Sequence, residues 1–125
     1  MTDYGFIFCF SYLYNPNTEP TEILRAAIPT GYRFRNFLVE RYGFKLENIT
    51  MVTDENKPTP VKSYLVQVLS NCVRKLKPDD RFLYLFIGHG GRYTTNYLDS
   101  TGFVEYQTCG DDFNGYCTGI EGILS

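Results

Sequence analysis

The pattern of apolar and polar residues divides the first two thirds of the chain into alternating strands and helices. Residues 4–12 (YGFIFCFSY), 48–54 (NITMVTD) and 81–88 (RFLYLFIG) are short and largely apolar, as is typical of strands buried in a parallel sheet. A helix is predicted within 29–44, since apolar residues recur there at helical spacing: Phe34, Phe37, Leu38 and Tyr42. Gly43 then stands where a C-terminal cap belongs.

A second helix is predicted from Thr59, as N-cap, and Pro60, as first helical residue, to about Lys77. It carries one apolar stripe: Val61, Leu65, Val68, Cys72 and Leu76. The order β-α-β-α-β predicts an α/β domain with a mostly parallel sheet flanked by helices. Residues 92–125 are rich in Gly, Thr and Asp without a helical period, so loops and a short hairpin are expected there. No linker interrupts residues 1–125, which we interpret as a single domain.

Composition excludes several function classes. The formal net charge is -2, so no basic field indicates nucleic acid or an acidic membrane. The apolar run near the N-terminus is too short for a membrane span, and no basic residue precedes it as in a signal peptide. We therefore expect a cytoplasmic protein.

The cysteines suggest neither zinc nor disulfides. Cys9, Cys72, Cys109 and Cys117 form no CxxC pair, and the chain has 1 His. Cys9, within a strand, and Cys72, on a helix stripe, are expected in the core. Cys109 and Cys117 follow in the loop region, either as exposed reactive thiols or as plain loop thiols.

One segment partly matches a calcium loop. In residues 110–121, Asp112, Asn114, Gly115 and Glu121 occupy positions 3, 5, 6 and 12 of such a loop. Position 1 is Gly110 and no helix is predicted on either side, so we expect no cofactor from this pattern.

The single histidine follows the third apolar run, in Gly88-His89-Gly90-Gly91. Ligands bind beyond the carboxyl ends of parallel strands, and glycines let backbone approach a substrate closely. His89 is thus placed as a general base, and the Gly90 N–H could face a developing oxyanion. The alternative is a histidine in a tight turn without catalytic function.

These segments, in this order, resemble the caspase-like cysteine proteases, and metacaspases (peptidase C14) most. IGHGG resembles the family's histidine segment, GFIFCFSY its first strand, and residues 24–44 its first-helix segment. ITMVTDENKPTP resembles its strand–Asp–Pro-Thr segment, and GDDFNGY, at 110–116, resembles its Gly-Asp-Glu…Asp-Gly-Tyr loop. The resemblance implies a caspase-like three-layer sandwich, of which residues 1–125 are an incomplete p20-like part. It also implies a cysteine endopeptidase acting after Arg or Lys, often with calcium, with His89 in a Cys–His dyad and the Gly90 amide in the oxyanion hole.

The chain departs from the family pattern at two places. In caspase-type enzymes the cysteine lies about 50 residues after the histidine, in an Asp-x-Cys stretch at the end of a fourth buried strand, and no such stretch is present here. The family's Gly-Cys-x-Asn-Asp falls on Ala26, Ala27, Ile28, Pro29 and Thr30. Thr30 therefore replaces the carboxylate that would hold a basic substrate side chain.

Three hypotheses follow. The first is a cysteine endopeptidase domain by lineage that is inactive alone, because it lacks the nucleophile while His89 keeps its place. The second is a non-enzymatic pseudoprotease that pairs through an open sheet edge with a caspase-like homologue. The third is an active peptidase that uses Cys109 or Cys117 with His89. Their partners would be a protein or peptide substrate, or that homologue.

Overall fold

A three-stranded parallel sheet forms the centre of the protein. In the computed structural model, which describes residues 1–16, 18–94 and 103–109, the strands are β1 (Asp3–Cys9), β2 (Ile49–Thr53) and β3 (Arg81–Ile87). Their order is β2-β1-β3, and β1 pairs in parallel with both neighbours. The predicted α/β class and parallel sheet are confirmed. The central strand is the most buried one, with Phe6, Ile7, Phe8 and Cys9 all buried.

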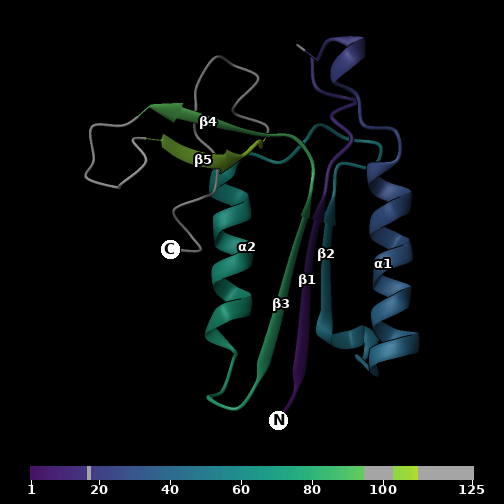
Figure 1. Ribbon diagram of the computed structural model, residues 1–125, viewed down its shortest axis with the longest axis vertical. Coiled ribbons are helices and arrows are strands. Elements are labelled where there is room, and N and C mark those ends of the chain that lie inside the picture. The colour runs from purple at the N-terminus through teal and green to yellow at the C-terminus, as the bar shows by residue number, and fades with distance from the viewer. Residues whose placement is uncertain (17, 95–102, 110–125) are drawn as a thin grey trace.

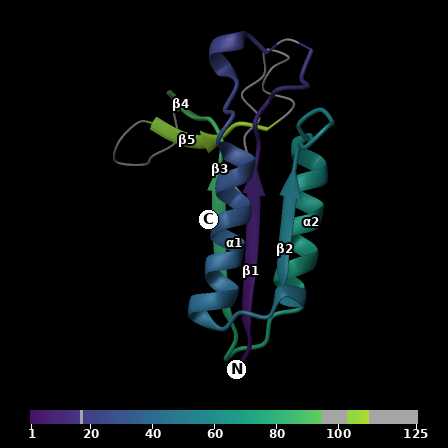
Figure 2. The ribbon, with the colours of Figure 1, turned by 90° about the vertical axis from the view of Figure 1, so that its right-hand side faces the viewer.

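Two helices cover the sheet, one on each face. Figures 1 and 2 show α1 (Ala27–Tyr42) and α2 (Lys62–Arg74) on opposite sides of the strands, which gives three layers. The predicted end of the first helix is confirmed, because Gly43 adopts the left-handed conformation with φ 71°. The close packing of α1 on β1 depends on Gly31, where a Cβ would lie 2.5 Å from Cys9 Sγ.

The predicted start of the second helix is wrong. Val61, and not Thr59, is the N-cap of α2. Thr59 is buried and its hydroxyl donates to a carboxylate of Asp54 at 2.6 Å. The hydroxyl serves this longer-range contact and so does not cap the helix. The helix also ends at Arg74, before the expected Lys77.

The core between α2 and the sheet is aromatic. Phe6, Phe8 and Phe10 of the β1 segment pack with Leu65 and Leu69 of α2, and the rings contact one another edge-on or stacked. Tyr12, Val52 and Cys109 complete this buried cluster. The cluster reaches the carboxyl end of the sheet, so the segments at that end pack against it.

A hairpin follows the sheet, as predicted. The strands β4 (Gly90–Thr94) and β5 (Phe103–Gln107) pair antiparallel, and Figure 1 shows them beyond the carboxyl ends of the parallel strands. The short 3-10 helices η1 (Pro20–Glu22) and η2 (Leu46–Asn48) lie in connecting segments.

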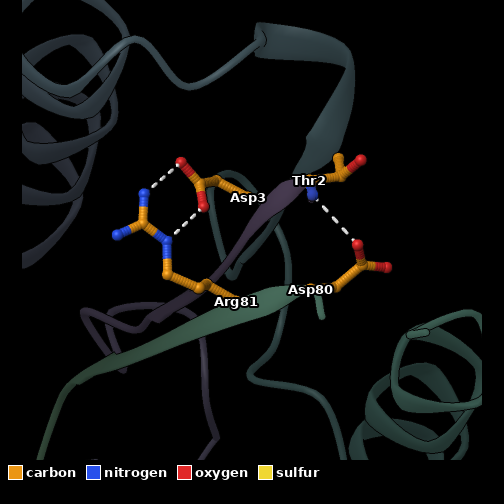
Figure 3. Close-up of polar contacts among 4 residues, drawn as sticks. All are labelled: Thr2, Asp3, Asp80 and Arg81. Atoms are coloured by element: carbon orange, nitrogen blue, oxygen red, sulfur yellow. Dashed lines mark hydrogen bonds and ion pairs between the residues drawn. The ribbon is translucent and has the colours of Figure 1, made fainter. Parts of the chain in front are cut away.

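At the opposite end, polar contacts join the beginnings of β1 and β3. Figure 3 shows Arg81 donating to both carboxylate oxygens of Asp3, at 2.7 and 2.9 Å, and the Thr2 amide donating to Asp80 at 2.9 Å. Since these contacts link residues 78 positions apart, they fix the register of β1 against β3. No helix among the described residues is long and apolar enough to cross a membrane.

Candidate active site

His89 lies at the carboxyl end of β3, between that strand and β4. Its predicted place at the end of a parallel strand agrees with the structure. Among the described strands β1 is central and β3 has one partner. The side chain of His89 is half-buried, so the imidazole is neither sealed in the core nor fully in water.

A backbone carbonyl orients the imidazole. His89 Nε2 lies 2.6 Å from the carbonyl oxygen of Glu22, the last residue of η1. A carbonyl can only accept a hydrogen bond, so this contact requires the proton on Nε2. In the neutral ring the other nitrogen, Nδ1, is then the basic one.

Tyr12 holds the backbone of the histidine segment. Its buried hydroxyl accepts a hydrogen bond from the His89 amide at 3.0 Å and donates one to the carbonyl of Thr108 at 2.7 Å. The Thr108 amide in turn donates to the His89 carbonyl at 2.8 Å. The tyrosine ring also packs beside the imidazole, with centroids 5.1 Å apart. One phenol thus connects the ends of β1, β3 and β5.

Asp54 fixes Tyr12 in turn. This fully buried carboxylate, directly after β2, accepts from the amides of Ser11 and Tyr12 at 2.8 and 2.7 Å and from the hydroxyls of Ser11 and Thr59 at 3.2 and 2.6 Å. Tyr12 has φ 65°, a conformation that bulky residues rarely adopt. The bonds to Asp54 hold it there.

The glycines on either side of His89 differ in their surroundings. At Gly88 a Cβ would lie 2.6 Å from the Tyr12 hydroxyl and 2.8 Å from Phe86 Cζ, so glycine is required for the approach of that hydroxyl. Gly90 is exposed and pairs with Gln107. Because the Thr108 amide bonds to the His89 carbonyl, Gly90 and Gln107 form a non-hydrogen-bonded pair. The Gly90 N–H therefore points away from β5.

Cys9 and Cys72 lie away from the imidazole. Cys9 is fully buried in β1, and burial, with the charges of Asp54 and Glu55 as smaller causes, raises the pKa of its thiol to about 12. Cys72, on α2, has its Sγ 3.6 Å from Thr50 Oγ1, near the starting half of the strands. The expectation of packing roles agrees with these positions.

Cys109 is fully buried in the aromatic core cluster. The exposed, reactive alternative for this thiol is therefore wrong. Cys117 and the calcium-like segment 110–121 lie outside the described residues. Within the described residues, no group of three or more His, Cys, Asp or Glu side chains could hold a metal ion.

A hollow of about 370 Å³, which we call the Thr30 hollow, lies beside the histidine segment. Leu24, Arg25, Ala26, Thr30, Ile87 and Gly88 line it. The structure thus brings the first-helix segment, where a family carboxylate was expected, next to the residue preceding His89. The Thr30 hydroxyl lies 3.3 Å from Arg33 Nη2, which donates to it.

Sequence reasoning missed the residues that hold the imidazole. Tyr12 and Glu22 gave no signal, since one lies in an aromatic-rich run and the other acts through its backbone. Asp54 carried a signal, a carboxylate directly after a buried strand, but Tyr12 and Ser11, whose amides donate to it, are 42 and 43 residues away. The sequence marks Asp54 only through the resemblance of its segment, ITMVTDENKPTP, to the family.

The parallel sheet, its two covering helices and the histidine at a strand end define a caspase-like α/β domain. The family described as "Metacaspase, peptidase C14 domain" matches residues 8–116. The chain therefore belongs to the metacaspase family.

Curated relatives agree with this assignment. The chain is 35% identical over 89 residues to Metacaspase-7 of Arabidopsis thaliana, a match that covers 68% of this chain and 22% of the relative. It is 32% identical over 72 residues to Metacaspase-1 of Kluyveromyces lactis, covering 55% and 17% respectively, and 32% identical over 85 residues to Metacaspase-1B of Aspergillus fumigatus, covering 66% and 20%. The chain thus spans about a fifth of the length of the relatives it matches.

Proposed function

We propose that this chain is the histidine-bearing part of a cysteine endopeptidase domain, with His89 as general base and the Gly90 amide as a donor to the oxyanion. The observation that carries the proposal is the contact between His89 Nε2 and the Glu22 carbonyl at 2.6 Å. It holds the ring in one tautomer at a strand end, with Nδ1 left to take a proton from a thiol.

The Gly90 amide fits the second role. In acyl transfer, negative charge develops on the carbonyl oxygen of the substrate, and a preorganised N–H near the base stabilises it. The pairing of the hairpin directs the exposed Gly90 N–H away from β5. Base and donor are consecutive along the backbone, so the backbone between β3 and β4 sets their separation.

We further propose that the chain alone is inactive, because no cysteine in its described part is suited to be the nucleophile. The thiolate is the reactive form, and the pKa of about 12 keeps Cys9 protonated near neutral pH. Cys109 is buried in the core cluster and Cys72 lies towards the other end of the sheet. The thiol that His89 would activate must then come from another segment or another chain.

A peptide carrying a thiol-reactive electrophile tests this proposal. The chain, its His89→Ala variant and its Cys117→Ser variant are incubated with the probe and labelled sites are mapped by mass spectrometry. We expect no His89-dependent labelling at any cysteine. Labelling of Cys117 or Cys109 that disappears in His89→Ala would establish the active-peptidase hypothesis instead.

A second candidate function is that of a non-enzymatic module that pairs with a caspase-like homologue. The observation in its favour is the outer edge of β3, which has no strand partner among the described residues. Beside this edge lies a largely apolar hollow of about 520 Å³, lined by Phe34, Phe37, Leu38, Tyr42, Phe82 and Leu83 among others. A strand of the homologue with apolar side chains would gain backbone hydrogen bonds from the edge and burial from the hollow.

Size measurement separates this candidate from the first. The chain is run by sedimentation velocity alone and mixed with a full-length metacaspase. A complex that is lost on changing Leu83→Lys, but not on changing the exposed Val73→Lys on α2, supports pairing at the β3 edge. The absence of any complex would remove this candidate.

A further inference from the structure

The Thr30 hollow has the wrong charge for a basic ligand. Arg25 is the charged residue among its lining residues, and this guanidinium makes no ion pair with any residue that the structure describes. The Thr30 hydroxyl accepts from a second guanidinium, that of Arg33. A lysine or arginine side chain entering the hollow would approach two like charges.

The nearby carboxylates do not neutralise this charge by direct contact. Glu22 Oε1 accepts from the Glu19 amide at 2.8 Å. Glu55 lines a neighbouring hollow that also includes Arg25, but its Oε1 accepts from the Tyr32 hydroxyl at 2.9 Å. Each of these carboxylates has its own hydrogen-bond donor, and neither residue lines the Thr30 hollow.

The hollow is next to the proposed chemistry on two sides. Gly88, which lines it, directly precedes His89, and Ile23, which also lines it, directly follows Glu22. It therefore adjoins both members of the contact between His89 Nε2 and the Glu22 carbonyl. A peptide whose carbonyl carbon lies near the imidazole would place a neighbouring side chain within reach of this hollow.

We propose that the Thr30 hollow binds an acidic peptide side chain, Asp or Glu, through the Arg25 guanidinium. The inference rests on the proposed function for its place beside the reacting centre. Arg25 acts as a specificity-determining residue, because a guanidinium pairs with a carboxylate through two parallel hydrogen bonds. The apolar walls from Leu24 and Ile87 exclude water from the methylenes of that side chain.

Peptide binding tests this proposal without requiring turnover. Capped tripeptides that differ only in a C-terminal Asp, Asn or Arg are titrated into the ¹⁵N-labelled chain at low salt, and affinity is taken from the Gly88 amide and the His89 ring signals. We expect the Asp peptide to bind roughly ten-fold more tightly than the Asn peptide, the lower end of the range for charged hydrogen bonds because Arg25 is exposed. The Arg peptide should bind most weakly.

Variants assign the effect to one guanidinium. Arg25→Ala should remove the preference for Asp over Asn, and Arg25→Glu should reverse the order of the Asp and Arg peptides. Arg41→Ala, which removes an exposed charge at the far end of α1, is the matched control and should leave the preference intact. Equal binding of the three peptides, tighter binding of the Arg peptide, or an equal loss in Arg41→Ala would overturn the inference.

The two proposals fail in distinguishable ways. An Asp preference that depends on Arg25, in a chain that also shows His89-dependent turnover, would uphold the inference and refute the proposal that the chain alone is inactive. Equal binding of the three peptides by a chain without such turnover would do the reverse.

Discussion

At the scale of single residues, the imidazole is held by groups that are distant in sequence. Tyr12 and His89 are 77 positions apart, and Tyr12 and Thr108 are 96 apart. Loss of the Tyr12 hydroxyl would leave the His89 amide and the Thr108 carbonyl without this bridge. Buried groups that lose their partner cost about 1–3 kcal/mol each in protein stability.

We therefore predict that Tyr12→Phe lowers the free energy of unfolding by about 1–3 kcal/mol and broadens or shifts the His89 ring signals. Urea unfolding and NMR of the single histidine measure the two effects. Tyr14→Phe is the control, since Tyr14 is half exposed and its hydroxyl makes a longer bond of 3.4 Å to Asn56. If both variants unfold like the unmodified chain, Tyr12 does not position His89.

A second prediction concerns Cys9. Because burial raises the pKa of its thiol to about 12, Cys9 should resist iodoacetamide at pH values up to about 9 and react only after unfolding. Peptide mapping after a timed pulse, with and without urea, measures this protection. Since its pKa is raised in the fold, Cys9 contributes stability below its ordinary pKa of 9.0 that is lost as the pH rises towards 12. Fast labelling of Cys9 in the folded chain would refute the core assignment.

The sequence predicted the place of His89 but not what surrounds it. A glycine-flanked histidine after an apolar run is a local signal, and it was sufficient. The contacts of Tyr12, Glu22 and Asp54 depend on how three strand ends converge, and no local spacing encodes that convergence. Thr59 illustrates the limit of local patterns. Its sequence context indicated a helix cap, but its hydroxyl donates a hydrogen bond to the buried carboxylate of Asp54 instead.

At the scale of elements, the packing of α1 on β1 depends on one missing methyl group. A Cβ at Gly31 would lie 2.5 Å from Cys9 Sγ and 3.1 Å from Met51 Cε. Alanine favours the helix by about 1 kcal/mol over glycine, but overpacking costs about 1–3 kcal/mol. The steric term should win because β1 is the central strand and cannot shift alone.

Gly31→Ala is accordingly predicted to destabilise the chain by about 1–2 kcal/mol, and Cys9→Ala in the same chain should recover part of that loss. Thermal unfolding of the two single variants and the double variant gives the coupling between the sites. If Gly31→Ala were stabilising, the approach of α1 to β1 would be looser than the structure shows.

The starting ends of β1 and β3 give a prediction for acid. The Arg81 side chain bonded to Asp3 lowers the pKa of that carboxyl below its ordinary 3.8, and backbone donors from Lys77 and then Thr2 lower that of Asp80. Groups with a lowered pKa stabilise the fold above their ordinary value, and this stability is lost as the pH falls through the lowered value.

Asp3→Asn should therefore show a smaller loss of melting temperature than the unmodified chain when the pH is lowered from about 6 to about 2. Asp79→Asn, at an exposed neighbouring carboxylate, serves as control and should behave like the unmodified chain. Identical acid profiles for all three proteins would show that the pair in Figure 3 does not contribute to stability.

Most of the elements could be predicted because their signals are local. Apolar runs predicted all three parallel strands, and Gly43 marked the end of α1. The start of α2 and the edge position of β3 could not be read in this way. The start of α2 depends on the hydrogen bond between Thr59 and Asp54. The edge position of β3 depends on the order of the strands, in which the aromatic-rich β1 takes the centre of the sheet.

At the scale of the whole molecule, the family assignment and the site give different amounts of information. The metacaspase family is established over residues 8–116, while the chain spans about a fifth of the length of the relatives it matches. Within that part the fold presents an oriented imidazole and a hollow with positive charge. Neither the buried Cys9 and Cys109 nor Cys72 on α2 is suited to act with that imidazole.

The measurement that tests this account most directly is hydrolysis of fluorogenic peptide reporters by the purified chain and by its His89→Ala variant. The panel contains reporters ending in Arg, Lys and Asp, each with and without calcium. The account predicts no turnover that depends on His89, because general-base help alone is worth only about 10²–10⁴-fold and a covalent route needs a thiolate. Clear turnover by the chain that is abolished in His89→Ala would contradict it and would identify a working nucleophile within these residues.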